Sequence, residues 1–346
     1  MRRTAMLLAA LVAGCGGEPP TPLYADYLWR LGNVIDADAP ELAAVVAPPL
    51  RYPRARERRR AVPAVRGGVL ELFELARCDV AELIAERNSI LGRHADAATH
   101  FANGGRVLRR LESCRQRLDA KREPELAARL DELVAQKRPA LEAQAWNATF
   151  GARAFAGWWS PSARGLTPEA VQQADPAASL RTLVRARNAA HAGEMDAAQA
   201  AFSDAYQGLE RRPYGGAWIE SAQVSLAALE AAAAMLAAVD TDRLCPQARP
   251  TPRARVLHTV FRQRYVARVQ PYLAALSRGM EAIAQPLEAL WPGKDAAVPA
   301  VAGFRHRTWH AGPEGLRARL TEATREHAEA WQRVLRACDL MPEAPG

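Results

Sequence analysis

Apolar residues recur three and four positions apart along most of the chain, which is the spacing of one face of an α-helix. The stretch from Leu23 to Ile35 follows this pattern throughout. Strict alternation of apolar and polar residues, the mark of a half-buried strand, is nearly absent. In the second half the pattern predicts helices at about 176–191, 195–210, 217–239, 253–290 and 313–338. The sequence therefore predicts an all-α protein, built as an irregular multi-helix bundle.

The first half predicts shorter helices with one long interruption. Helical character is expected at about 69–77 and 79–91, and a long helix at 123–146 that bends near Pro139. Residues 37–68 break the pattern, because prolines forbid a continuous helix there. These prolines are Pro40, Pro48, Pro49, Pro53 and Pro63. We expect this Pro/Arg-rich segment to be an extended arm laid across the body.

A change in composition near residue 160 divides the chain into two expected helical lobes. The N-terminal lobe spans 23–160 and includes the arm, and the C-terminal lobe spans 161–346. The second is richer in alanine, which has the best helix propensity. Trp158 and Trp159 lie at the junction. They either pack between the lobes or form an exposed partner contact, and the sequence leaves both open.

The first sixteen residues carry the clearest functional signal. Arg2 and Arg3 precede a short apolar run that ends in Val-Ala-Gly-Cys at Cys15. A basic start, a short apolar stretch and small residues at its end predict an export signal, here residues 1–14. The run is too short to span a membrane, which takes about 20 apolar residues.

The end of this signal resembles a bacterial lipobox. The resemblance implies cleavage before Cys15, diacylglycerol on its sulfur and acylation of the new amino terminus, with 15–22 as a lipidated tether. Several acyl chains give stable anchoring. Gly16 stands where aspartate would retain the protein in the inner membrane, so the resemblance implies the periplasmic face of the outer membrane. The alternative is an ordinary signal peptide with a chance cysteine.

The charge balance is basic but arginine-biased. The chain has a formal net charge of +8, and 46 basic residues less the lysines Lys121, Lys137 and Lys294 leave 43 arginines. A basic protein favours anionic partners such as lipid headgroups or nucleic acid. A periplasmic location argues against nucleic acid, and a GC-rich genome is an alternative source of the arginines.

Four cysteines remain when Cys15 is assigned to lipid. An even number in an oxidising compartment predicts disulfides. Three pairings are possible, and we favour Cys78–Cys114 and Cys245–Cys338 because each bond then stays within one half of the chain. The alternative is a set of free buried thiols.

Catalytic and metal motifs are missing from the local sequence. There is no Gly-rich phosphate loop, no GxSxG and no HExxH. His306 and His310 have helical spacing for a shared ligand, but no carboxylate is near them in sequence. We therefore predict no metal site and no cofactor, and name no catalytic residue.

Two polar segments are candidate contact sites. The arm residues Arg58, Arg59 and Arg60 are expected either to contact anionic lipid headgroups or to form a solvated or carboxylate-paired surface. The other segment lies in the helix expected at 79–91 and just after it. Its candidate residues are Glu86, Arg87, Asn88, Ser89 and Arg93.

This second segment has two interpretations. It is a polar knot that ties the arm to the bundle, since charged residues are not fully buried unless paired. Alternatively it is a ligand site in which Arg87 or Arg93 holds an anion while Asn88 and Ser89 orient it.

Several short motifs resemble the proteobacterial lipoproteins catalogued as domain of unknown function 3080. They are the lipobox, Tyr-Leu-Trp-Arg-Leu at 27–31, the arm ending at Pro63, Leu75–Cys78, Glu86–Arg93, Trp146-Asn147 and Gln270–Leu273. The resemblance covers most of the mature chain. It implies an envelope lipoprotein and supplies no catalytic or ligand residues.

The function expected from these features is a non-enzymatic binding or scaffolding module. It would be held at the membrane by its lipid anchor and bind an envelope protein or polymer. One alternative is an enzyme acting on an envelope polymer or lipid through dispersed carboxylates such as Glu82 and Glu86. Another is a carrier of an apolar ligand between alanine-rich helices.

Overall fold

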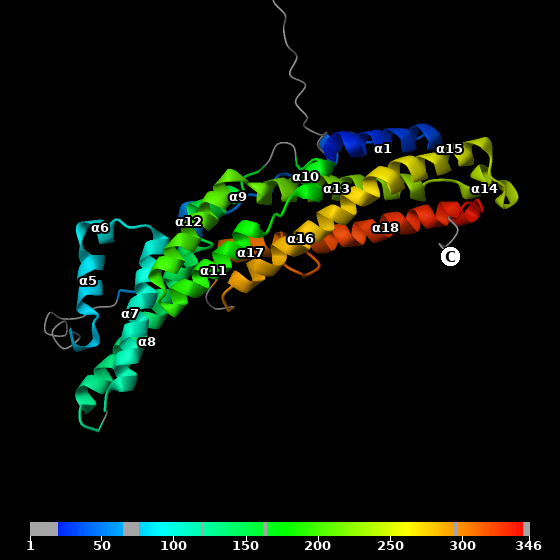
Figure 1. Cartoon of the computed structure of the whole chain (residues 1–346). Helices are drawn as coiled ribbons and strands as arrows, with labels where there is room; N and C mark the ends of the chain where they lie inside the picture. The colour runs from blue at the N-terminus through cyan, green and yellow to red at the C-terminus, as the bar shows by residue number, and fades with distance from the viewer. Residues whose placement is uncertain (1–19, 65–75, 120, 162–164, 294–296, 342–346) are drawn as a thin grey trace, which may run out of the picture.

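The computed structural model describes residues 20–64, 76–119, 121–161, 165–293 and 297–341, and these are mostly helical with no strand among them. The molecule is elongated, and α13, α16 and α18 run along its length (Figure 1). The hairpin of α7 and α8 lies at one end, and α14, α15 and the C-terminal part of α18 lie at the other. The all-α prediction is confirmed.

The helices before residue 160 are mostly short. They are α1 (Pro20–Ile35), α2 (Leu42–Val45), α3 (Ala55–Arg58), the 3₁₀ turn η1 (Ala76–Cys78), α5 (Ala81–Asn88), α6 (Ile90–Arg93), α7 (Ala97–Arg117), α8 (Pro124–Ala148) and α9 (Arg153–Trp158). The long helix expected at 123–146 is α8, with Pro139 inside it. Most of the helix expected at 69–77 lies outside the described residues.

The helices of the second half follow the predicted ranges closely. They are α10 (Pro168–Gln173), α11 (Ala178–Ala192), α12 (Met195–Arg211), α13 (Tyr214–Ala237), α14 (Thr241–Leu244), the 3₁₀ turn η2 (Pro246–Ala248), α15 (Pro252–Val260), the π-helix η3 (Phe261–Val269), α16 (Gln270–Leu290), α17 (Pro299–Arg307) and α18 (Leu316–Ala337). Helices α10, α14 and α17 lie outside the predicted ranges, and the periodicity did not reveal them.

Helix α13 is the core of the molecule. It packs against α1, α16 and α18, and most of its residues are buried. It is long and apolar enough to cross a membrane, but 72% of its apolar window is buried inside the protein, as expected of a core helix. Its two buried serines, Ser221 and Ser225, donate to carbonyls one turn back at 2.8 and 2.7 Å. Their hydroxyls are thereby satisfied without water.

The packing does not follow the division expected at residues 160 and 161. Helix α1 lies before that boundary but packs with α13 and α15 behind it. Helices α11 and α12 lie behind the boundary and pack with α7. The contact between α7 and α11 is close, because a Cβ on Gly105 would lie 1.8 Å from the Ala190 carbonyl oxygen. The buried residues of both halves therefore form one connected core.

The helix expected at 253–290 is continuous through α15, η3 and α16. Within η3 the turns widen, and Gln270 N–H donates to the Tyr265 carbonyl five residues back. Pro271 follows directly. Proline has no N–H, and its ring clashes with the carbonyl four residues earlier in a regular helix. The wider turns accommodate that ring without ending the helix.

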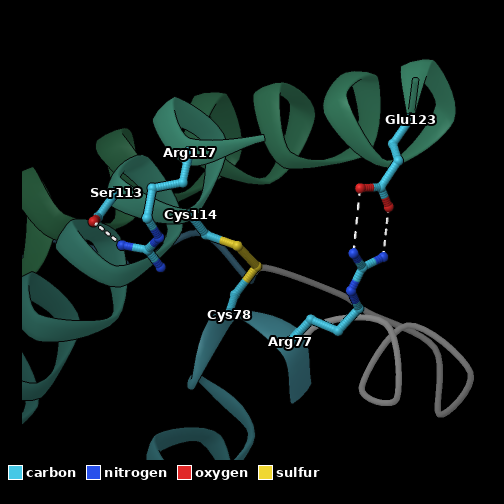
Figure 2. The surroundings of a disulfide bond; sticks show 6 residues. All are labelled: Arg77, Cys78, Ser113, Cys114, Arg117 and Glu123. Carbon is cyan, nitrogen blue, oxygen red and sulfur yellow. Dashed lines mark hydrogen bonds and ion pairs between the residues drawn. A yellow bond between two sulfur atoms is a disulfide. The ribbon is translucent and has the colours of Figure 1, made fainter. Parts of the chain in front are cut away.

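Both expected disulfides are present, at opposite ends of the molecule. Cys78–Cys114 joins η1 to α7, beside a two-bond contact between Arg77 and Glu123 (Figure 2). Cys245–Cys338 joins the turn after α14 to the end of α18. The two bonds span 36 and 93 residues of sequence.

The Pro/Arg-rich segment lies across the body as an arm, as far as its described residues extend. Its backbone accepts a hydrogen bond from Trp146 Nε1 at the Arg58 carbonyl, 2.7 Å away. Asn147 pairs with both the N–H and the carbonyl of Arg60, each at 2.9 Å. Gln223 of α13 donates to the Pro48 carbonyl at 3.0 Å. Side-chain amides and an indole thus replace the backbone pairing that the prolines prevent.

Candidate functional site

A groove of about 400 Å³ lies between α16 and α18, and Ala311 of the turn that precedes α18 also lines it. This volume falls within the range of about 300–1,000 Å³ that small-molecule sites occupy. Helix α16 contributes Ser277, Met280 and Glu281, and α18 contributes Arg317, Ala318 and Thr321 among others.

The charged groups of this groove are already paired. Arg317 forms an ion pair with Glu281 across the groove. Glu322, also in the groove wall, accepts a hydrogen bond from Arg325 at 3.1 Å, and this contact lowers the pKa of its carboxyl. A general acid needs a raised pKa to hold a proton near neutral pH. The pairing therefore favours binding over proton transfer at this site.

A small apolar chamber of about 30 Å³ adjoins the groove. Trp159, Trp218 and Trp309 line it, and it shares Met280 and Arg317 with the groove. The rings of Trp159 and Trp309 stack with centroids 5.4 Å apart. The indole N–H groups of all three tryptophans are buried and have no hydrogen-bond partner within the described residues. A chamber of this size has room for about one water molecule or one ligand atom group.

The groove and chamber together form a site with a polar mouth and an apolar, tryptophan-lined end. Such a site can hold a ligand with an apolar tip, with the Arg317–Glu281 ion pair at the boundary between groove and chamber. Within the described residues no group of three or more His, Cys, Asp or Glu side chains could hold a metal ion. His306 and His310 stack 4.7 Å apart, and His310 Nδ1 accepts the Gly312 N–H at 2.7 Å.

One family pattern, described as "Protein of unknown function (DUF3080)", matches residues 24–342. The chain belongs to the DUF3080 family. No curated protein matches it, and no solved structure matches it. The family resemblance expected from the short motifs is therefore confirmed, and the family brings no assigned activity with it.

The motifs that carry the resemblance have structural contacts in this DUF3080 chain. Tyr27 lies within hydrogen-bond distance of two α18 residues, 2.7 Å from His327 Nε2 and 2.8 Å from Trp331 Nε1. Tyr272 donates to the Leu166 carbonyl at 3.0 Å. Trp146 and Asn147 hold the arm, as described above. These motifs position the helices rather than line the groove.

The sequence candidates at 86–93 lie on the surface. Glu86, Asn88, Ser89 and Arg93 are exposed, and Arg87 is half-buried. Ser89 ends α5 and caps α6, since its hydroxyl donates to the Glu86 carbonyl and accepts the Gly92 N–H. These bonds are local and do not reach the arm, so the polar knot is not what the described contacts show. The anion site stays a prediction.

A buried lysine beside this segment was missed by sequence reasoning. Lys137 of α8 is 5% exposed, and its pKa falls to about 8 because burial disfavours the charged form, with a further contribution from nearby Arg87. The available sequence signal was a lysine, a rare residue in this chain, at an inward-facing position of a helix.

The arm arginines differ from one another. Arg58 is only 9% exposed, and its guanidinium donates to the carbonyls of Gly151 and Pro53. This corrects the expectation that Arg58 contacts lipid, because its charge is turned inward onto backbone oxygens. Arg59 is exposed and Arg60 is half-buried. Their contact with a membrane stays a prediction.

The tryptophan pair at the expected lobe junction is buried. Trp158 and Trp159 are 1% and 2% exposed, with ring centroids 4.6 Å apart. The exposed partner contact is therefore wrong, and Trp159 instead lines the chamber. Glu82, named with Glu86 as a possible catalytic carboxylate, is exposed in the first turn of α5.

Proposed function

We propose that this protein is an outer-membrane lipoprotein, anchored through Cys15 with its helical body in the periplasm. The observation that carries the proposal is the use of the five cysteines. Four of them pair in two disulfides at opposite ends of the body, which fits an oxidising compartment. The fifth, Cys15, stands at the end of an export signal.

The body is proposed to act as a non-enzymatic binding or scaffolding module for an envelope protein or polymer. The groove between α16 and α18 supports this role, since its size suits a ligand or an inserted side chain. Its carboxylates, Glu281 and Glu322, are bound to arginines. An enzyme of the proposed alternative class would need at least one carboxyl free to exchange a proton.

The anchor is tested by labelling cells with radioactive palmitate and fractionating their membranes. We expect label on the wild-type protein and none on Cys15→Ser, which should leave the membrane fraction. Gly16→Asp is the matched control for sorting, and should stay labelled but move to the inner membrane. An unlabelled wild-type protein, or a Cys15→Ser variant that still fractionates with the outer membrane, would contradict the anchor.

The binding role is tested by crosslinking in intact cells that express a variant whose groove is filled by a large side chain. Ala318→Trp places a large ring in the groove wall, whereas Ala274→Trp places one on the exposed side of α16, outside the groove. We expect the first variant alone to lose a crosslinked product of the wild type. Equal products from both variants would contradict the groove as the binding site, and a captured lipid would favour the carrier alternative.

A further inference from the structure

Helix α1 and the segment formed by α15 and η3 run antiparallel, side by side at one end of the molecule (Figure 1). Arginines join them at both ends of the contact. Arg264 lies 3.4 Å from Asp26, and Arg253 lies 2.7 Å from Asp36. The acidic residue nearer the end of α1 thus pairs with the earlier arginine, and the one nearer its start pairs with the later arginine, as antiparallel helices require. Because the two helices are held together in this way, their outer sides form one surface.

The α15–η3 part of this surface is strongly basic. Between Asp242 and Glu281 the sequence has eight arginines and no acidic residue. Two of them hold α1, as described above. Six others are exposed and have no ion pair among the described residues. Arg255 lies on α15 and Arg262 and Arg268 on η3, while Arg243 and Arg249 precede α15 and Arg278 follows on α16. A surface with uncompensated positive charge attracts anionic partners.

Exposed apolar side chains accompany this charge. Trp29 of α1 is 57% exposed, whereas the chain's seven other tryptophans are buried or half-buried. The outward line of α1 around it, from Pro22 through Ala25 to Asn33, carries no charge. Val256 of α15 and Val266 of η3 are 53% and 39% exposed. Tryptophan favours the membrane–water interface, and arginines beside apolar residues are typical of helices that lie on membranes.

The position of α1 relative to the proposed anchor brings this surface close to the bilayer. Pro20, the first residue of α1, follows Cys15 by five residues. Five residues of extended chain span at most about 18 Å. An acylated Cys15 would therefore hold the start of α1 within that distance of the headgroups.

We propose that the outer side of α1 with Trp29, together with the exposed side of α15 and η3, is a membrane face that docks on an anionic phospholipid surface. Its orientation rests on the proposed lipid anchor. The arginines that the sequence predicted to contact lipid were Arg58, Arg59 and Arg60 of the arm. The structure turns Arg58 inward and exposes arginines on α15 and η3 beside α1.

The test measures binding without the anchor. The chain from residue 15 onward, carrying Cys15→Ser, is sedimented with phosphatidylcholine vesicles that contain or lack phosphatidylglycerol. We expect binding only with phosphatidylglycerol, and its loss in high salt, because salt screens exposed charges. Arg255→Glu with Arg262→Glu should weaken binding by about tenfold or more, since each such arginine contributes substantially near an anionic surface.

Matched variants separate the face from overall charge. Arg110→Glu with Arg153→Glu makes the same charge change at exposed positions of α7 and α9, away from the face, and should leave binding within about twofold of the parent. Trp29→Ala keeps the charge and should weaken binding while the fold, checked by circular dichroism, is retained.

The membrane face is overturned if the two double variants bind equally, or if phosphatidylglycerol makes no difference. This result does not depend on palmitate labelling of the wild type. Failed labelling together with face-dependent vesicle binding would overturn the anchor alone.

Discussion

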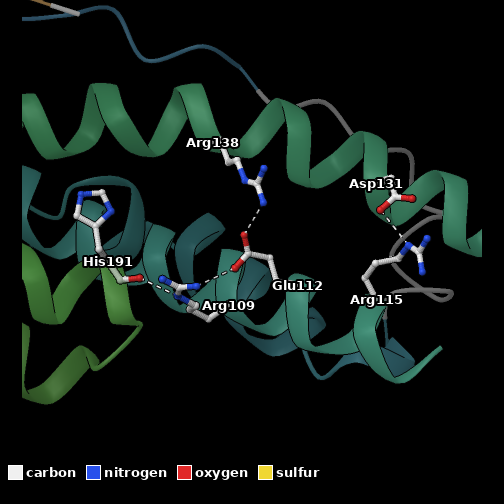
Figure 3. A network of polar contacts seen from close by, with 6 residues as sticks. All are labelled: Arg109, Glu112, Arg115, Asp131, Arg138 and His191. Carbon is white, nitrogen blue, oxygen red and sulfur yellow. Dashed lines mark hydrogen bonds and ion pairs between the residues drawn. The ribbon is translucent and has the colours of Figure 1, made fainter. Parts of the chain in front are cut away.

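The two ends of the molecule use arginine differently. At the hairpin end, α7 and α8 place their arginines against carboxylates (Figure 3). Glu112 accepts hydrogen bonds from Arg109 and Arg138, each at 3.0 Å, and Arg115 donates to Asp131 at 2.9 Å. At the α1 end, which comprises α1, α15, η3 and the C-terminal half of α18, arginines on α15 and η3 have no acidic residue in their own segment.

The comparison shows what the net charge of the chain cannot. Arginines occur throughout the chain, and at the hairpin end many of them are paired with carboxylates. Exposed ion pairs of this kind contribute about 0–1 kcal/mol each to stability. The uncompensated set lies beside the helix that follows Cys15. The distribution of pairing, rather than the total charge, distinguishes a surface for an anionic partner.

The largest expected difference between the ends concerns the disulfides. Replacing Cys245 and Cys338 by alanine should lower the free energy of unfolding by about 5 kcal/mol in the chain-entropy description, against about 4 kcal/mol for Cys78 and Cys114, because the closed loop is longer. Urea denaturation of the two double variants measures this. A larger loss for the Cys78–Cys114 variant would reverse the comparison.

A buried histidine at the α1 end should make stability depend on pH. Since Trp331 donates to the Tyr27 hydroxyl, that hydroxyl donates to His327 Nε2. His327 is then neutral, with its proton on Nδ1, and burial lowers its pKa to about 3. In the unfolded chain this histidine has a pKa of about 6.5, so the unfolded state takes up the proton at a higher pH than the folded state does. Stability from this group is complete above pH 6.5 and is lost as pH falls toward 3.

Between pH 7 and pH 5 this linkage predicts a loss of about 2 kcal/mol. His327→Gln keeps an acceptor for Tyr27 and should remove that part of the pH dependence, measured by urea denaturation at both pH values. His191→Gln is the control at the hairpin end. His191 is only half-buried, and burial lowers its pKa while nearby Glu142 acts in the opposite direction. If both variants reduced the pH dependence of stability equally, the two ends of the molecule would not differ in their pH-dependent stability.

The smallest expected effect comes from unpairing arginines at the hairpin end. Glu112→Gln removes the carboxylate shared by Arg109 and Arg138 and should cost about 1 kcal/mol or less. Vesicle binding should change by less than about twofold, because this end lacks an exposed tryptophan and lies far from α1. A large gain in binding by this variant would show that free arginines alone suffice, without the membrane face.

The sequence predicted the elements better than their assembly. The long helices α8, α13 and α15–α16 were predictable because their apolar residues keep helical spacing over many turns. Helix α6 was not, because its start depends on one capping hydroxyl, that of Ser89. The disulfides were predictable from the even number of cysteines and the compartment implied by the export signal.

The candidate sites were harder to predict, because each joins residues far apart in sequence. Arg58 is buried only because the Gly151 carbonyl is placed beside it by the end of α8. The chamber brings Trp159, Trp218 and Trp309 together from three separate segments. Local sequence patterns do not reveal that these residues lie close together in the folded chain. The basic segment after Asp242 was visible in the sequence, but its relation to Trp29 required the antiparallel contact with α1.

The most direct measurement of the central claim is the quenching of Trp29 by brominated phosphatidylglycerol. The acylated wild-type protein is compared with Trp29→Phe in vesicles that contain brominated or ordinary lipid. The account predicts that bromine quenches part of the wild-type emission and that Trp29→Phe removes this part, since the remaining tryptophans are at least partly buried. No bromine-dependent quenching, or the same quenching in both proteins, would contradict it.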